Sequence, residues 1–218
     1  EIYNFVTHAD AGYIVMEYVG GRSLKQLLKQ RLAANGGQPN PLPVDQSLAF
    51  LIEILPAFSY LHDLRLIYCD FKPENVIQVG DALKLIDLGG VRHAGDEDSV
   101  IYGTVGFQAP EVATQGPSIA SDIFTIGRTL MVLSADVPGY QTTYETSIPA
   151  AEEMPLIAAY DSVYRLLLKC CARDPNDRFT SAEELRVQLL GVLREVVADR
   201  TPGIATTAMA SSLFEAPT

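Results

Sequence analysis

A short polar loop, residues 68–75 (YCDFKPEN), constrains this chain more than any other stretch. It places a carboxylate, an ammonium group and an amide at Asp70, Lys72 and Asn75, between two short β-rich runs. A second carboxylate, Asp87, comes twelve residues after Asn75 and directly follows another such run. Asp, Pro and Asn all favour turns, so the loop alone is also compatible with an ordinary polar turn. Its meaning depends on the chemistry of these side chains and on the rest of the chain.

The four side chains match the groups that phosphoryl transfer requires. That reaction uses a carboxylate that accepts or orients the proton of a hydroxyl group, and a cation that meets the γ-phosphate. It also uses two oxygen ligands that hold Mg²⁺ against the phosphates. Asp70, Lys72, Asn75 and Asp87 supply these groups in that order. ATP and Mg²⁺ are therefore the expected phosphate donor and metal ion.

Hydrophobic and turn patterns predict an α+β chain, mainly helical with a few short β-hairpins. Apolar residues at helical spacing indicate helices, and β-branched runs bounded by turn residues indicate strands. The predicted helices cover residues 23–34, 44–62, 118–134, 161–172 and 180–198. The predicted strands cover residues 2–6, 13–19, 66–68, 76–79 and 83–86. Ser23 is the predicted cap of the first helix, and Thr180 with Glu183 forms the predicted capping box of the last.

Composition narrows the classes of partner. Hydrophobic residues make up 48% of the 218 residues, which is typical of a globular domain, and the formal net charge is −11. This charge disfavours nucleic acid, so we expect none as a partner. The most apolar stretch, residues 47–61, contains Glu53 and Pro56 and is too short for a membrane span. Three cysteines without a C-x-x-C pair predict free thiols, no zinc site and a cytoplasmic location.

Motifs in order along about residues 1–195 resemble those of eukaryotic-type Ser/Thr protein kinases. The loop 68–75 stands for the usual H-R-D-L-K-P-E-N, and Asp87-Leu88-Gly89 stands for D-F-G. The other matches are a hinge region at residues 13–19, an activation-segment end at 103–111, a central C-lobe helix starting at 121–127 and a late kinase arginine at 178. The resemblance implies a protein-kinase-like fold.

A closer similarity is to the actinobacterial protein kinase G family. The phrases that carry it are EILPAFSYLH (53–62), YCDFKPEN (68–75), LKLIDLGGV (83–91), YGTVGFQAPE (102–111) and GVLREVVA (191–198). In that family a rubredoxin-like metal module precedes the kinase domain and tetratricopeptide repeats follow it. The resemblance implies that residues 1–19 are the last two N-lobe strands and the hinge, 20–199 the C-lobe, and 200–218 a linker or tail. Because the first residue is Glu1, we expect the chain to begin inside a longer gene product.

The resemblance assigns a role to each residue of the catalytic loop. Asp70 is the expected catalytic base, Lys72 the cation that neutralises phosphoryl charge, and Asn75 and Asp87 the Mg²⁺ ligands. Thr104 is expected to hydrogen-bond both Asp70 and Lys72. The alternatives are a surface ion pair for Lys72 and ordinary turn positions for Asn75, Asp87 and Thr104. The implied reaction transfers the γ-phosphate of ATP to Ser or Thr of a protein substrate.

The adenine ring is expected to contact the other end of the site. The resemblance implies hydrogen bonds to the backbone of Glu17 and Val19, with Ile77 beneath the ring and Met16 as gatekeeper. Val19, Ile77 and Met16 are equally compatible with ordinary core packing.

The resemblance also implies residues that support the catalytic loop, and it shows one departure from the kinase pattern. Glu111 and Arg178 are expected to form a buried ion pair, and Asp122 to accept N–H groups of the catalytic loop. Cys69 stands where most protein kinases have the arginine that pairs with a phosphate on the activation loop. Arg92 is the one basic residue near that loop that could replace it. We therefore expect activity without activation-loop phosphorylation, governed instead by flanking domains.

The kinase motifs within these 218 residues are incomplete. No glycine-rich phosphate loop, no strand lysine of the V-A-I-K type and no partner glutamate helix precedes the hinge. We therefore expect the chain alone to bind Mg-ATP weakly and to transfer phosphate poorly. A pseudokinase or scaffold, and a small-molecule kinase of the aminoglycoside or choline type, stay open as alternatives. The intact catalytic residues argue against the first, and residues 109–111 (APE) argue against the second.

Overall fold

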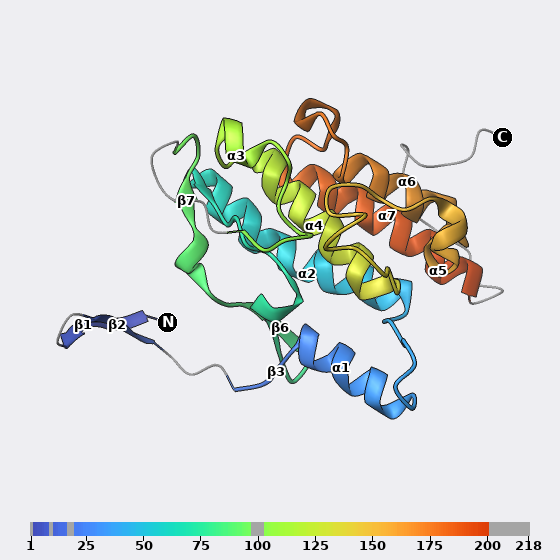
Figure 1. Ribbon diagram of the computed structural model, residues 1–218, viewed down its shortest axis with the longest axis horizontal. Helices are drawn as coiled ribbons and strands as arrows, with labels where there is room; N and C mark the ends of the chain where they lie inside the picture. Colours follow the sequence, from blue (N-terminus) through green and yellow to red (C-terminus); the bar gives the residue numbers. More distant parts are fainter. Residues whose placement is uncertain (1, 9–10, 17–19, 97–102, 201–218) are drawn as a thin grey trace.

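The N-terminal hairpin stands apart from a helical body in the computed structural model (Figure 1), which describes residues 2–8, 11–16, 20–96 and 103–200. β1 (Ile2–His8) and β2 (Ala11–Met16) pair in antiparallel fashion, with a register irregularity near Ile2. The hairpin predicted there is confirmed, and β1 is two residues longer than expected. Glu17 and Val19, the expected hinge residues, lie outside the described residues.

Two further small sheets lie on either side of the polar loop. The first has the order β3 (Arg22–Ser23), β5 (Val76–Val79) and β6 (Ala82–Leu85), and the second pairs β4 (Leu66–Ile67) with β7 (Arg92–His93). The runs predicted at 66–68, 76–79 and 83–86 are confirmed as β4, β5 and β6. Sequence reasoning missed the two-residue strands β3 and β7, because such short strands exist only through their partners. The strands of these sheets flank both ends of the polar loop, and β6 leads into Asp87.

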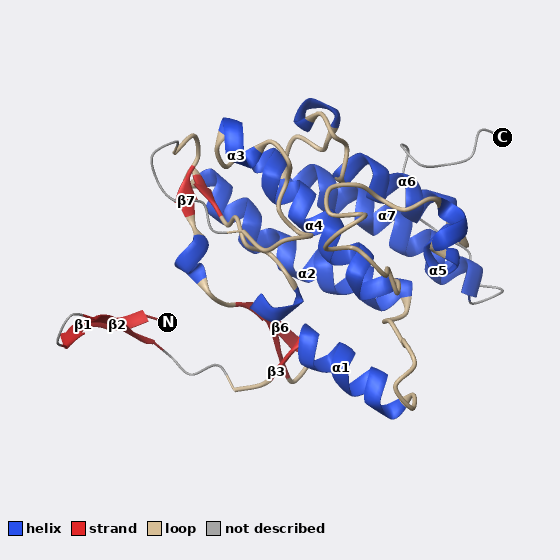
Figure 2. Cartoon of the chain, viewed as in Figure 1, coloured by secondary structure: helices blue, strands red, loops and turns tan. Residues whose placement is uncertain are grey.

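Helices make up most of the rest of the described chain (Figure 2). They are α1 (Leu24–Ala34), α2 (Val44–Asp63), α3 (Val112–Gln115), α4 (Ile119–Ser134), α5 (Pro155–Ala158), α6 (Asp161–Cys170) and α7 (Ala182–Arg200). The five predicted helices correspond to α1, α2, α4, α6 and α7. The short helices α3 and α5 were not predicted, because four residues are too few to show helical periodicity.

The N-cap of α1 is the residue predicted from the sequence, whereas the N-cap of α7 is not. Ser23 caps α1 as predicted, and the side chain of Gln26 completes the capping box. At α7 the prediction of Thr180 as cap is wrong by one residue. The amide of Glu184 donates to Ser181 Oγ at 3.0 Å, while the carboxylate of Glu184 accepts from the amide of Thr180 at 2.7 Å. The sequence alone does not decide between the adjacent Thr180 and Ser181, since both hydroxyls are good N-caps.

Helix α4 lies at the centre of the body and packs against α2, α6 and α7. Nearly all of its residues are buried, polar ones included. Gly127 sets its approach to α6, because a Cβ there would lie 2.5 Å from Cys170 Cβ. A larger residue would push the two helices apart, so this glycine sets the distance between α4 and α6.

Helix α2 contains the most apolar segment of the chain. It is 20 residues long and passes a length-and-hydropathy test for a membrane span, so the expectation that this stretch is too short is corrected. Its apolar side packs against α4 and α7, and Leu48 and Phe58 are completely buried. A core helix of a globular domain satisfies the same test, and one side of α2 is buried within the body.

Candidate active site

The polar loop is anchored from below by a buried carboxylate on α4. Asp122 Oδ2 accepts the amide of Tyr68 at 2.8 Å, and Oδ1 accepts the amide of Cys69 at 2.9 Å. His62, at the end of α2, places Nε2 2.9 Å from the same carboxylate. The expected bonds from Asp122 to the loop are present, whereas the contact with His62 was not foreseen. Three contacts on one carboxylate hold the loop start rigidly against α4.

This anchoring maintains a strained backbone immediately before Asp70. Cys69 has φ of +72°, a left-handed conformation that costs a non-glycine residue roughly 1–3 kcal/mol. Its thiol is buried and touches the carbonyl of Ile67. Burial and, to a smaller degree, the charge of Asp122 raise the pKa of Cys69 to about 12. The thiol therefore stays neutral, and the strained turn directs the Asp70 side chain away from the buried core.

Asp70, Lys72 and Thr104 form a closed triangle of short hydrogen bonds. Lys72 Nζ donates to Asp70 Oδ2 and to Thr104 Oγ1, both at 2.6 Å, and Thr104 Oγ1 donates to Asp70 Oδ1 at 2.7 Å. The side chains of Asp70 and Lys72 are 18% and 19% exposed, so the ion pair is partly shielded yet reachable from solvent. The triangle unites the loop with residue 104, more than thirty residues away.

Asn75 and Asp87 lie on the other side of Asp70. Asn75 Nδ2 donates to the backbone carbonyl of Asp70 at 2.9 Å, and the amide of Ile86 donates to the carbonyl of Asn75 at 2.9 Å. Asp87 follows directly, in a left-handed conformation with φ of +61°. One of its oxygens accepts the amide of Gly89 at 3.1 Å. The pairing of residues 75 and 86 thus brings the predicted metal ligands to adjacent positions.

The donor set suits Mg²⁺ held mainly by phosphate and water. Within the described residues no group of three or more His, Cys, Asp or Glu side chains could form a metal site. One carboxylate and one amide oxygen, from Asp87 and Asn75, are hard oxygen ligands. Mg²⁺ commonly keeps one or two such protein ligands and takes the rest from water and nucleotide phosphates. The residues present fit such a site.

Tyr68 supports the metal side of the loop. Its hydroxyl donates to the carbonyl of Ile86, and the side chain is completely buried. Burial, together with the charges of Asp87 and Asp70, raises the pKa of Tyr68. The phenol therefore stays a neutral donor, which ties the start of the loop to the segment that carries Asp87.

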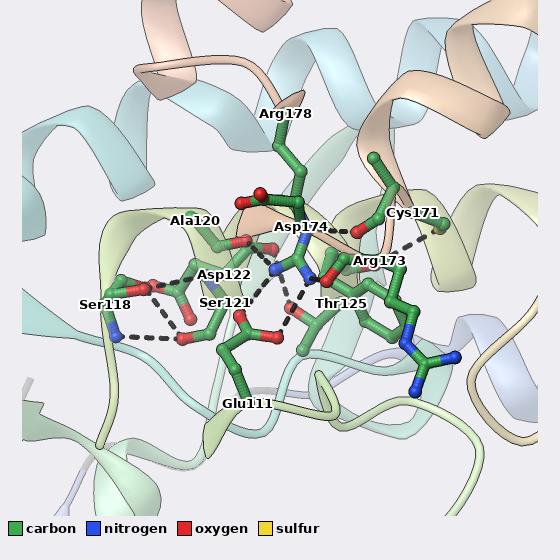
Figure 3. Close-up of polar contacts among 12 residues, drawn as sticks. Glu111, Ser118, Ala120, Ser121, Asp122, Thr125, Cys171, Arg173, Asp174 and Arg178 are labelled. Atoms are coloured by element: carbon green, nitrogen blue, oxygen red, sulfur yellow. Dashed lines mark hydrogen bonds and ion pairs between the residues drawn. The ribbon is translucent and has the colours of Figure 1, made fainter. Parts of the chain in front are cut away.

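A buried ion pair anchors the segment that follows Thr104. Arg178 donates from Nη1 and Nη2 to the two carboxylate oxygens of Glu111, at 2.6 and 2.9 Å. It also donates to the carbonyl of Ala120 (Figure 3). Two further contacts of Arg178 are a hydrogen bond to the carbonyl of Ala172 and a position over the ring of Phe124. The side chains of Arg178 and Glu111 are 0% and 6% exposed. The predicted pair is confirmed as a bidentate ion pair between distant segments.

The structure describes only some of the residues predicted to contact adenine. Met16 is the last residue of β2, and Ile77 is a half-buried residue of β5, opposite Ser23 and Lys84. Because Glu17 and Val19 are not described, the predicted adenine contacts stay predictions. Arg92 donates to the carbonyls of Gly89 and Val91, and its charge influences Cys69.

One buried residue of the site region escaped sequence reasoning. Arg128 lies on α4, fully buried, and donates to four backbone carbonyls. The signal available in the sequence is a lone arginine within the apolar run of residues 123–133. Such a charge inside a core helix indicates a specific partner, although its partners cannot be read from the sequence.

Comparison with known proteins agrees with this arrangement. Residues 1–190 match the family model of the protein kinase domain. The chain is 48% identical over 206 residues to the serine/threonine-protein kinase PknG of Mycobacterium leprae, covering 92% of this chain and 26% of that protein. It is 47% identical over 215 residues to PknG of Mycolicibacterium smegmatis, covering 94% and 27%. It is 31% identical over 219 residues to the serine/threonine-protein kinase PksC of Streptomyces coelicolor, covering 92% and 38%.

The chain thus spans about a quarter of the length of its PknG relatives. The resemblance inferred from the motifs, to Ser/Thr protein kinases and to the protein kinase G group in particular, is confirmed. The match covers both the loop that carries Asp70 and the segment that carries Arg178. The chain therefore belongs to the protein kinase domain family.

Proposed function

We propose that this chain contributes the catalytic base and the metal ligands for transfer of the γ-phosphate of ATP to Ser or Thr of a protein. The observation that carries the proposal is the triangle of Asp70, Lys72 and Thr104, held in place by Asp122. An ordinary polar turn would not need buried or half-buried side chains from two distant segments, Thr104 and Asp122, to position one carboxylate. The names of the relatives, serine/threonine-protein kinases, point to the same reaction.

The geometry supports a division of labour within the triangle. Asp70 accepts the proton of the substrate hydroxyl, because its carboxylate is held by Lys72 and Thr104 and is still reachable from solvent. Lys72, 2.6 Å from that carboxylate, places a positive charge beside the transferred phosphoryl group. Thr104 links the two and limits their movement. Mg²⁺ bound by Asn75 and Asp87 would supply further charge neutralisation at the phosphates.

The proposed domain arrangement follows the resemblance. Residues 1–19 would be the last two strands of the kinase N-lobe and the hinge, whose Glu17 and Val19 backbones would bind adenine above Ile77. Residues 20–199 would form the C-lobe, and 200–218 a linker. Because the chain spans about a quarter of its PknG relatives, rubredoxin-like and tetratricopeptide-repeat domains are proposed as its flanking partners. The three buried, free cysteines fit a reducing cytoplasm.

The proposal is tested on the full-length product of the gene. Radiolabelled ATP and a degenerate Ser/Thr peptide mixture serve as substrates, with Asp70→Asn as the matched variant. We expect label on Ser or Thr with the wild-type protein and a loss of at least about 100-fold with the variant. ATP binding without transfer would identify a pseudokinase. Transfer to an aminoglycoside or choline but not to peptide would identify a small-molecule kinase.

A further inference from the structure

Arg128 is a buried cation whose contacts differ from those of the other buried arginine. Its side chain is fully enclosed in the middle of α4, and it donates only to backbone carbonyls. Nε donates to Gly106 O at 2.7 Å, Nη2 to Tyr140 O and Tyr144 O at 2.9 and 2.6 Å, and Nη1 to Ser147 O at 2.5 Å. Within the described residues it forms no ion pair with a carboxylate, unlike Arg178 with Glu111.

Stability alone does not account for an arginine at this position. Burying a guanidinium without a directly paired carboxylate carries a large desolvation cost, and burial lowers the pKa of Arg128, a shift that the charge of nearby Glu145 opposes. A methionine or leucine would fit an apolar helix such as α4 at lower cost. An arginine offers something that these residues lack, a planar set of donors that can hold several carbonyls at fixed relative positions. The partners of Arg128 therefore identify what needs to be held.

The four carbonyls belong to two segments without regular structure. One is the turn at residues 104–107, and the other is the loop at residues 139–147. Further contacts join the same segments. The rings of Phe107 and Tyr140 meet edge to face with centroids 5.7 Å apart, and Gln141 Nε2 donates to Val105 O at 3.3 Å. Together the segments form one surface, which we call the acceptor ledge (residues 104–107 and 139–147).

Glycine makes the close approach within the acceptor ledge feasible. Gly106 has φ of +87°, and a Cβ there would lie 2.7 Å from Tyr140 O. The two segments thus meet backbone to backbone at the residue whose carbonyl Arg128 binds. A side chain at position 106 would separate them, so sequence and geometry both keep the ledge closed.

The acceptor ledge is directly connected to the proposed catalytic base. The amides of Phe107 and Gln108 donate to Thr104 O at 2.9 and 3.2 Å, and the Thr104 hydroxyl donates to Asp70. Val105, next to Thr104, is 53% exposed and gives the ledge an apolar, solvent-facing point. A polypeptide lying on the ledge would therefore present its hydroxyl group close to Asp70.

We propose that Arg128 is a positioning residue that holds the acceptor ledge in register with Asp70 and thereby determines how the protein substrate is bound. The inference rests on the proposed kinase function and names the residue that shapes its protein-binding side. Among the residues that the structure describes, the hydrogen bonds of Arg128 go to the acceptor ledge and not to Asn75, Ile77 or Asp87. Its loss therefore acts on the use of the protein substrate and spares the use of ATP.

Steady-state kinetics of the full-length gene product test this role, with radiolabelled ATP and the degenerate Ser/Thr peptide mixture. For Arg128→Met we expect kcat/KM for peptide to fall about 10- to 100-fold, as a misplaced acceptor would cause, with KM for ATP within about twofold of wild type. Arg128→Lys should recover only part of the loss, since one ammonium cannot bridge four carbonyls. Amide hydrogen exchange should increase at residues 104–108 in both variants.

Arg31→Met is the matched control. Arg31 also holds a loop through carbonyls, donating to Asn40 O and Pro41 O at 2.9 Å, but it does not touch the acceptor ledge. This variant should keep wild-type kinetics for peptide. If Arg128→Met does not fold, Tyr140→Leu loosens the same ledge by removing the ring contact with Phe107 and should raise KM for peptide.

The outcomes separate the two proposals. Unchanged peptide kinetics in Arg128→Lys, or in Tyr140→Leu, would overturn the role of Arg128 while the wild-type activity keeps the kinase proposal intact. A rise in KM for ATP equal to the rise in KM for peptide would show that Arg128 has only a general structural role. A wild-type protein that transfers no phosphate to peptide would overturn the proposed function and, with it, this inference.

Discussion

The hydroxyl group of Thr104 donates to the carboxylate of Asp70 at 2.7 Å, across 34 residues of sequence. The same oxygen accepts from Lys72 at 2.6 Å, so the neutral hydroxyl of Thr104 bridges the charged groups of Lys72 and Asp70. Thr104 thereby connects the described segment that begins at residue 103 to the proposed base.

Replacing Thr104 by valine keeps the shape of the side chain and removes the link. We expect kcat for peptide phosphorylation to fall about 10- to 100-fold, because Asp70 and Lys72 lose a shared partner and their mutual geometry. Thr104→Ser keeps the hydroxyl and should retain most of the activity. Steady-state assays with the full-length gene product measure both. Equal activity of the valine and serine variants would contradict the role of the hydroxyl.

Replacing Ser99 in the activation segment should leave activity nearly unchanged. Cys69 occupies the position of the arginine that would receive a loop phosphate, and its thiol is buried and neutral. We therefore expect Ser99→Ala to retain kcat within about twofold, because a phosphate on Ser99 would lack that arginine as its partner. Phosphatase treatment of the wild-type protein is the parallel control. A large loss of activity in either experiment would show that loop phosphorylation is required.

Breaking the pair of Glu111 and Arg178 should destabilise the fold. Arg178→Met leaves a carboxylate buried without its partner, and such changes typically cost about 3–5 kcal/mol of unfolding free energy. Urea denaturation followed by circular dichroism measures the loss. The double variant Glu111→Gln with Arg178→Met removes the orphaned charge and should recover part of it. A double variant as unstable as the sum of the two single variants would show that the residues do not interact.

Alkaline pH should destabilise the fold through its buried thiols. Burial raises the pKa of Cys69 and of Cys171 to about 12, and also raises that of Cys170. In the unfolded chain each thiol ionises near pKa 9.0. The folded state thus holds protons that the unfolded state releases, so the contribution is full below pH 9 and is lost as pH rises toward 12.

The expected slope between pH 9 and 11 is on the order of 1 kcal/mol per pH unit for each thiol. Urea denaturation at stepped pH measures it. Cys171→Ala should reduce the slope by one thiol's share, and a slope unaffected by that change would contradict the assignment. Thiol labelling of the native protein at pH 8 should be slow for all three cysteines, because each is buried and neutral.

The 218 residues assayed alone should bind Mg-ATP weakly. They contain no glycine-rich loop and no strand lysine before residue 17, and both parts position the phosphates in protein kinases. Equilibrium binding of a fluorescent ATP analogue compares this chain with the full-length gene product. Comparable affinity and robust turnover by the 218 residues would show that the motifs described here suffice.

Local patterns determined much of this protein. The loop of Asp70, Lys72 and Asn75 was recognisable from residue types at fixed offsets, and the cap of α1 from Ser23. Helices α2 and α4 were equally readable, because their periodicity extends over several turns. Such features depend on interactions between residues a few positions apart, which a linear sequence records directly.

Tertiary structure alone decided the features that depend on contacts between distant residues. It selected Ser181 rather than Thr180 as the cap of α7, and paired β3 with β5 across more than fifty residues. It brought Arg128 to four carbonyls of two loops that show no periodicity of their own. A backbone carbonyl is the same chemical group at every position, so no residue pattern marks which ones a buried arginine will bind.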